Sequence, residues 1–85
     1  MKEFNYIIKD SFGIHTRPAG TLVKEAGRFK SEITIKKAGK EVDLKKILAL
    51  MGLGVKMNDE ITLNITGEDE EEAYLFFKEF FENNL

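Results

Sequence analysis

Two hydrophobic periods alternate along the 85 residues, and this alternation most constrains what the chain can fold into. Apolar residues at every second position predict a strand with one buried face, whereas apolar residues three and four apart predict a helix. The period-two segments are residues 4–9, 32–36, 41–44 and 61–66. Helical segments alternate with them, so the expected order is strand, helix, strand, strand, helix, strand, helix. This order predicts an α+β fold in which helices pack on one face of a single sheet.

The first two helical segments differ in how much apolar surface they carry. The first has one apolar stripe, with Pro18 suited to its first turn and with Gly20 and Gly27 inside it. The second is short and apolar on more than one side, and Gly54 after it is expected to adopt a left-handed conformation. Residues 37–40 between the second and third strands are expected to form a hairpin turn. The stripe of the first helix is Ala19, Leu22, Val23, Ala26 and Phe29.

The last helical segment begins in an acidic run and continues in an aromatic one. Asp69 is expected to be its N-cap, with Glu72 completing a capping box, and the carboxylates complement the helix dipole. An aromatic stripe at helical spacing is typical of a core and not of a cofactor site. The expected stripe is Ala73, Phe76, Phe77 and Phe80, flanked by Tyr74 and Phe81.

The length of 85 residues and the absence of cysteine predict one domain over residues 1–85, stabilised by its hydrophobic core alone. A single His and no Cys exclude the usual clusters of soft metal ligands, disulfide frameworks and Cys-based catalysis. The longest apolar stretches fall far short of a membrane span, and the first residues do not resemble a signal peptide. We therefore expect a cytoplasmic protein without membrane insertion.

Charge is distributed unevenly along the chain, although its formal net value is only −2. Residues 15–56 contain ten Lys and Arg against four acidic residues, whereas residues 57–85 contain nine acidic residues against Lys78 alone. A basic middle region predicts a face that attracts an acidic partner. Nucleic acid is not the expected partner, because the pI is near 5.4 and no basic stripe is interleaved with aromatic residues.

The only His lies in the segment from Gly13 to Gly20, at the expected start of the first helix. Unpaired backbone N–H groups and the helix dipole make such an end a binding site for anions. Arg17 adds a guanidinium that can bind phosphate, and Pro18 holds the backbone at the helix start. A neutral imidazole can accept a phosphoryl group directly, so His15 is a candidate phosphorylation site.

The segment Gly13-Ile14-His15-Thr16-Arg17-Pro18-Ala19 resembles the active-site signature of the HPr family, the histidine phosphocarriers of the bacterial phosphoenolpyruvate-dependent sugar phosphotransferase system. Length, element order, the hairpin, residues 44–47, the turn at residues 53–54 and residues 67–73 resemble the family as well. The resemblance implies an open-faced β-sandwich, a four-stranded antiparallel sheet covered on one face by three helices. It also implies a carrier that is not an enzyme, accepting a phosphoryl group from Enzyme I on Nδ1 of His15 and passing it to sugar-specific IIA domains. The same resemblance implies no cofactor for this chain.

The resemblance assigns roles to further residues. Arg17 would be the charge partner of the phosphoryl group, and Thr16 and Pro18 would contribute to loop and phosphate geometry. Enzyme I and IIA domains would dock on the exposed faces of the first two helices, and we expect the carrier itself to be a monomer. The implied docking residues are Gly20, Thr21, Lys24, Ile47, Leu48 and Met51.

Two positions depart from the family pattern. Many members have a Ser that a kinase phosphorylates at the position of Lys46, so we expect that regulation to be absent from this chain. Thr16 replaces the usual Ala or Ser, and it could cap the first helix.

Three other functions remain open at this stage. The chain could be a regulatory module that keeps the docking face, a hypothesis favoured by Lys46 and opposed by the intact His15 and Arg17. It could also serve a branch other than sugar uptake, such as nitrogen-related signalling or dihydroxyacetone phosphorylation. A small-molecule-binding α+β domain is the remaining alternative.

Overall fold

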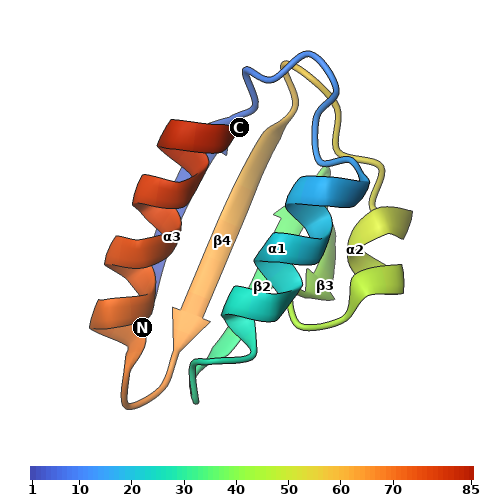
Figure 1. Cartoon of the computed structure of the whole chain (residues 1–85). Coiled ribbons are helices and arrows are strands. Elements are labelled where there is room, and N and C mark those ends of the chain that lie inside the picture. Colours follow the sequence, from blue (N-terminus) through green and yellow to red (C-terminus); the bar gives the residue numbers. More distant parts are fainter.

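A computed structural model describes residues 1–85. The four strands form one antiparallel sheet in the order β1-β4-β2-β3, and the three helices cover one face of it (Figure 1), which confirms the predicted fold. Helix α3 packs against β1 and β4, α2 packs against β3, and α1 lies beside α2. The elements are β1 Lys2–Ile7, α1 Thr16–Ala26, β2 Glu32–Lys37, β3 Lys40–Asp43, α2 Ile47–Gly52, β4 Glu60–Thr66 and α3 Glu70–Asn84.

The period-two alternation divides the sheet into an apolar and a polar face. In β4, Ile61, Leu63 and Ile65 are fully buried beneath the helices, as the alternation predicts. They belong to one cluster of 20 buried apolar side chains. The opposite face is polar, and there the Thr62 hydroxyl donates a hydrogen bond to Asn5 Oδ1 at 2.6 Å. One core between sheet and helices therefore holds the elements together.

Two predicted elements have different bounds in the structure. β1 spans Lys2–Ile7 in place of residues 4–9, and it ends there because the next N–H groups, those of Ile8 and Lys9, donate to the carbonyls of Asp59 (3.0 Å) and Leu85 (2.6 Å) outside the strands. α1 ends at Ala26, so Gly27 is the C-cap and does not lie inside the helix. The Phe29 side chain is buried as predicted, although it lies beyond the helix.

The buried stripe of α3 is also different from the predicted one. Ala73, Phe77 and Phe81 are fully buried, whereas Phe76 and Phe80 are only half-buried and flank them. Phe81 makes edge-to-face contacts with the rings of Phe4 and Tyr6 on β1, at centroid distances of 5.8 and 5.7 Å. An aromatic-rich helix is compatible with several apolar faces, and the position of β1 selects this one.

The predicted capping box at the start of α3 is wrong, although Asp69 is the N-cap residue. The Asp69 carboxylate binds another segment of the chain, accepting hydrogen bonds from the N–H groups of Lys30 (2.8 Å) and Ser31 (2.9 Å) and from the Ser31 hydroxyl (2.6 Å). Glu70, not Glu72, accepts from the Gly67 N–H at 3.1 Å. Asp69 therefore ties α3 to the start of β2.

The two expected turns form where the sequence predicts them. Ala38 and Gly39 have φ values of +50° and +84°, which is the backbone of a two-residue turn between β2 and β3. Gly54, after α2, has φ +67°, so the prediction of a left-handed residue there is confirmed.

Candidate functional site

His15 occupies the N-cap of α1. Its backbone is extended (φ −97°, ψ −172°), its carbonyl accepts from the N–H of Ala19 at 2.9 Å, and its side chain makes no capping hydrogen bond. The imidazole is 45% exposed. The ring is therefore accessible at the end of the helix where the sequence predicts a phosphorylation site.

The first turn of α1 has unpaired backbone donors. Thr16 and Arg17 are its first two residues, and their N–H groups have no hydrogen-bond partner, while Pro18 has no N–H. No acidic side chain lies in this turn, and Arg17 is exposed and makes no ion pair. Because His15 is the N-cap, the suggestion that Thr16 caps the helix is wrong. The arrangement presents two N–H donors and a guanidinium beside the imidazole, a combination suited to an anion.

Gly13 determines how the loop before His15 lies on the rest of the protein. The residue is buried and its φ is +67°, and an added Cβ would collide with the Val55 carbonyl oxygen and lie 2.7 Å from Lys56 Cα. The next N–H, that of Ile14, donates to the same Val55 carbonyl at 3.1 Å. Glycine is thus required here both by conformation and by the close approach of the two backbones.

Residues 54–59, which lie against Gly13, are held in place by an ion pair. Lys37 Nζ, at the end of β2, donates to the Gly54 carbonyl at 2.7 Å and lies 2.8 Å from Asp59 Oδ2. The same oxygen accepts from the Lys56 N–H at 2.8 Å. The Lys37 side chain and, next, the Lys56 N–H lower the pKa of Asp59. The support beneath the His15 loop therefore includes contacts that come from the β2–β3 hairpin.

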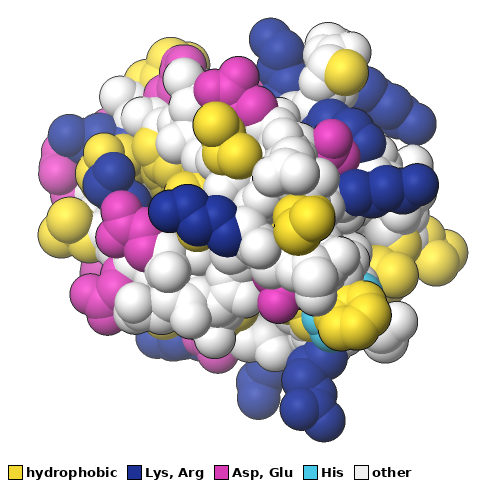
Figure 2. Space-filling view, turned by 90° about the horizontal axis from the view of Figure 1, so that it is seen from above, with side chains coloured by type: hydrophobic (Ala, Val, Ile, Leu, Met, Phe, Trp, Pro, Cys, Tyr) yellow, Lys and Arg dark blue, Asp and Glu magenta, His cyan; other side chains and the backbone are white.

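Two residues that the sequence analysis did not single out contact the imidazole. The Phe12 ring meets it edge to face, with 5.6 Å between centroids and 67° between planes, and Asp10 Oδ2 lies 3.9 Å from Nε2. In Figure 2 only part of the cyan imidazole is visible, next to yellow apolar atoms. The loop composition of residues 10–13 was the available signal, since an Asp side chain in a loop favours an Asx turn with the backbone N–H two residues on, here that of Phe12.

The six predicted docking residues lie on α1 and α2, which pack side by side (Figure 1). All six are exposed, and Leu48 is 85% exposed. A Cβ added at Gly20 would meet nothing within 4 Å, so no contact inside the protein requires glycine there. The α1–α2 face therefore consists of Gly20, Thr21, Lys24, Ile47, Leu48 and Met51.

The adjacent lysines at the start of α2 have different environments. Lys46 is exposed and is the N-cap of α2, without a capping hydrogen bond. Lys45 is half-buried, and its Nζ donates to the Phe29 carbonyl at 2.9 Å. Lys45 therefore connects the start of α2 to the segment after α1. The Lys46 ammonium forms no ion pair or hydrogen bond within the protein.

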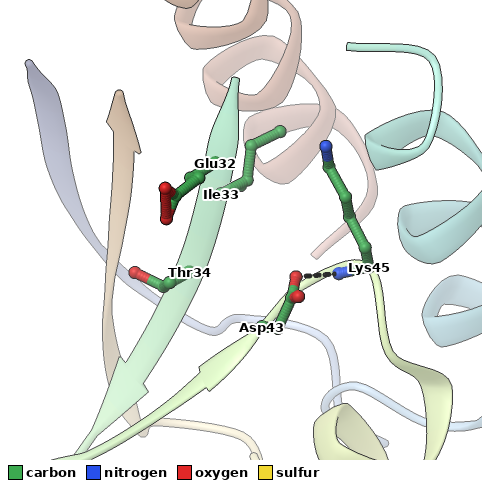
Figure 3. Close-up of a pocket in the computed structure, with 5 residues that line it drawn as sticks. All are labelled: Glu32, Ile33, Thr34, Asp43 and Lys45. Atoms are coloured by element: carbon green, nitrogen blue, oxygen red, sulfur yellow. Dashed lines mark hydrogen bonds between the residues drawn. The ribbon is translucent and has the colours of Figure 1, made fainter. Parts of the chain in front are cut away.

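A pocket of about 300 Å³ lies away from His15, where β2 begins (Figure 3). Lys45 reaches from this pocket to Phe29, just beyond the C-terminal end of α1, whereas His15 lies at the N-terminal end. No group of three or more His, Asp and Glu side chains could hold a metal ion. None of the helices has the length and apolar character that crossing a membrane requires. The pocket is lined by Glu32, Ile33, Thr34, Asp43 and Lys45.

Comparisons with known proteins agree on one family. The family model described as the PTS HPr component phosphorylation site matches residues 2–83. The phosphocarrier protein HPr of Mycoplasma genitalium is 47% identical over 85 residues, covering 99% of this chain and 97% of the relative. The structure of HPr-C-His from Thermoanaerobacter tengcongensis has 39% identity and a TM-score of 0.92 over 96% of this chain and 92% of that one. A Mycoplasma histidine-containing phosphocarrier protein has 40% identity and a TM-score of 0.89 over 92% of this chain and 89% of that one.

Proposed function

This chain belongs to the HPr family of phosphocarrier proteins of the phosphotransferase system, and from that premise we propose that it accepts a phosphoryl group from Enzyme I on His15 and passes it to sugar-specific IIA domains. Members of this family carry the group and do not catalyse a reaction of their own. His15 is the acceptor in this proposal, Arg17 its charge partner, and Thr16 and Pro18 shape the loop and the first turn of α1.

The observation that carries the proposal is the exposed imidazole at an uncompensated helix start. The N–H groups of Thr16 and Arg17 have no partner, and the first turn contains no acidic residue. A phosphoryl group on Nδ1 of His15 would add negative charge at this end, where the helix dipole and unpaired donors favour it. The interaction is with solvent-exposed groups, so it stabilises the carried group without trapping it.

Partner docking on the α1–α2 face is supported by its combination of apolar and basic groups. Ile47, Leu48 and Met51 are exposed large apolar side chains on one short helix, and Lys24 lies on neighbouring α1. Exposed apolar patches rimmed by charge are typical of protein interfaces. We propose that Enzyme I and IIA domains bind here through acidic surfaces that the basic middle of the chain attracts.

The Lys46 position leads us to propose that this carrier lacks the serine phosphorylation of many relatives. A lysine has no hydroxyl to phosphorylate, and its charge is opposite to that of phosphoserine. Nothing in the fold pairs with the Lys46 ammonium. A partner that selects phosphoserine at this position should therefore not bind the chain.

The first experiment is intact-protein mass spectrometry after incubation with phosphoenolpyruvate and Enzyme I. We expect one acid-labile phosphoryl addition to the chain and none to His15→Ala, because the imidazole is the acceptor. The labelled chain should then lose the group to a IIA domain. If an active Enzyme I adds nothing to the folded chain, the sugar-carrier proposal is wrong and a regulatory module or a carrier of another branch takes its place.

A second experiment tests the docking face with a matched pair of exposed leucines. Leu48 on α2 is 85% exposed and Leu75 on α3 is 66% exposed, and only Leu48 belongs to the α1–α2 face. Leu48→Asp should raise the KM for transfer from Enzyme I about tenfold or more, as expected for an apolar interface anchor. Leu75→Asp should leave this KM unchanged. Equal KM values for the two variants would contradict docking at α2.

A further inference from the structure

The imidazole of His15 is held from two sides by one short loop. Asp10 Oδ2 accepts a hydrogen bond from the Phe12 N–H at 3.0 Å, and the same oxygen lies 3.9 Å from His15 Nε2. The Asp10 carbonyl accepts from the Gly13 N–H at 3.1 Å, which closes the turn. The Phe12 ring then contacts the imidazole edge to face. Asp10 Oδ2 thus fixes the backbone of Phe12 and also lies beside Nε2 of the imidazole that the Phe12 ring contacts.

The exposure of Phe12 indicates that this contact is not part of the core. The side chain is 75% exposed and lies outside the cluster of 20 buried apolar residues. Its neighbour in the fold is the imidazole, at a distance and angle typical of favourable aromatic pairs. Phe12 therefore contributes to the orientation of His15 more than to the stability of the fold.

Asp10 is the only acidic group within 4 Å of the imidazole nitrogens. The other charged side chains at this end are Arg17 in the first turn of α1 and Lys56 in the α2–β4 segment. The segment after α3 contributes the Leu85 carbonyl, which accepts from the N–H groups of Lys9 and Asp10. Asp10 is thus the group that distinguishes the two ring nitrogens, because it lies on the side of Nε2.

We propose that Asp10 is a positioning residue for phosphohistidine: it holds Nε2 and its proton on the loop side, which directs Nδ1 toward the phosphoryl group, while the Phe12 ring limits rotation of the imidazole. This inference rests on the proposed phosphorylation of His15. It adds to that function a determinant of how readily the carried group leaves.

The chemistry of the transfer explains why a proton on Nε2 matters. The Nδ1–P bond breaks with its electron pair returning to Nδ1, and a new bond forms from phosphorus to the acceptor. In hydrolysis the acceptor is a water oxygen, which gives up a proton to solvent. When Nε2 carries a proton, the group that leaves is neutral imidazole, whereas without that proton it would be an imidazolate anion. Asp10 Oδ2, 3.9 Å from Nε2, lies where its negative charge attracts a proton carried on this nitrogen, so the geometry supports departure of the neutral imidazole.

The test uses chemically phosphorylated protein, so that it does not depend on Enzyme I. The chain, Asp10→Asn and the control Glu79→Gln are each phosphorylated with potassium phosphoramidate, and loss of the group is followed by phosphorus NMR from about pH 5 to about pH 9. An Asn side-chain oxygen can still accept from the Phe12 N–H, so this variant removes the charge and keeps the turn. Glu79 is an exposed carboxylate on α3 without hydrogen bonds or ion pairs.

We expect phosphorylated Asp10→Asn to lose its phosphoryl group about two- to fivefold more slowly near neutral pH, the range that an exposed charge pair provides. The rates of variant and parent should converge in acid, where Nε2 is protonated in both, and Glu79→Gln should match the parent throughout. Coinciding pH profiles for Asp10→Asn and the parent would overturn the inference. Failure of Enzyme I to label His15 would instead contradict the proposed function, and the chemical experiment would still report on Asp10.

Discussion

Helices α1 and α3 both begin with backbone N–H groups that lack intrahelical partners and a capping side chain, but the charges around the two helix starts differ. At α3, the first turn contains Glu70, Glu71 and Glu72, and Glu70 is bound by the N-terminal ammonium of Met1 and by the Gly67 N–H. At α1, the first turn has no acidic residue and the N-cap side chain makes no hydrogen bond. Intramolecular carboxylates compensate α3, whereas α1 leaves its donors free.

The surroundings of the two helix starts differ in burial as well. Ser31 is fully buried next to Gly67, and its hydroxyl donates to Asp69, so the polar groups at α3 are satisfied inside the fold. At α1 the imidazole, Phe12 and Arg17 are exposed. Neither helix receives a capping hydrogen bond from its N-cap side chain. The difference is one of charge: carboxylates in the first turn of α3 complement its helix dipole, whereas the start of α1, where the proposed phosphoryl group would bind, has none.

The largest expected effect is that of disturbing the support of the α1 end. Gly13→Ala forces a Cβ into the Val55 carbonyl and a left-handed backbone on alanine, so it should lower the free energy of unfolding by about 2–4 kcal/mol. Urea unfolding followed by circular dichroism measures this. Gly20→Ala, in open space on α1 itself, is the control and should raise stability by about 0.5–1 kcal/mol. A tolerated Gly13→Ala would mean that the loop does not need its contact with Val55.

The next effect weakens the α3 end. Ser31→Ala removes a hydroxyl that donates to Asp69 at 2.6 Å and should lower stability by about 1 kcal/mol, the usual net value of one hydrogen bond. The rate of phosphorylation at His15 should not change, because the two ends share no contact. A slower phosphorylation in this variant would show that the starts of α3 and α1 are coupled.

A smaller effect is expected from adding a negative charge at the start of α1. His15→Asp places a capping carboxylate at the N-cap of α1 and should raise stability by about 0.5–1 kcal/mol while abolishing phosphorylation. His15→Ala should abolish phosphorylation without this gain. Thermal unfolding of the two variants side by side gives the difference. Equal stabilities would mean that the donors at the start of α1 are not available to an anion.

The smallest expected effect is a change in how strongly acid lowers the stability of the fold when one carboxyl group at the start of α3 is removed. The Ser31 hydroxyl and then the Lys30 N–H lower the pKa of Asp69, and the Met1 ammonium and then the Gly67 N–H lower that of Glu70. In the folded protein the pKa values of Asp69 and Glu70 lie below the ordinary 3.8 and 4.5. As the pH falls, the unfolded chain therefore binds protons at these two carboxyl groups before the folded protein does. The stabilisation is present above these ordinary values and is lost as the pH falls through the folded-state ones.

Urea midpoints measured between about pH 7 and about pH 3 test this. The parent should lose stability below about pH 4, and Asp69→Asn should lose less on acidification because it has one depressed carboxyl group fewer. The control Glu79→Gln, far from both helix starts, should follow the parent. An Asp69→Asn profile parallel to that of the parent would contradict the assignment of acid sensitivity to the α3 end.

Much of the fold could be predicted because it depends on local pattern. The buried residues Ile61, Leu63 and Ile65 of β4 follow period two, and the turn at Ala38 and Gly39 follows turn chemistry. The position of His15 at the start of α1 was predicted from its neighbours, since Pro18 favours a first helical turn. These predictions needed no knowledge of which elements lie side by side.

The errors occurred where a distant segment competes for a residue. Asp69 binds Ser31 and Lys30, about forty positions away, in place of its own helix, and Phe81 replaces Phe76 in the buried stripe because β1 lies on that side. Periodicity within a segment contains no information about such partners. Gly27 is a different case: it became the C-cap with local hydrogen bonds only, its N–H donating to the Val23 carbonyl.

The sequence by itself determined the order of strands and helices, the presence of one apolar core and the motif around His15, because these depend on residue types at short spacings. The tertiary structure alone decided the β1-β4-β2-β3 order and the contact of Gly13 with Val55. It also decided the placement of Asp10 and Phe12 against the imidazole. The physical reason is that a local pattern states which surface a residue must bury or expose, whereas the group that meets that surface depends on how the whole chain packs.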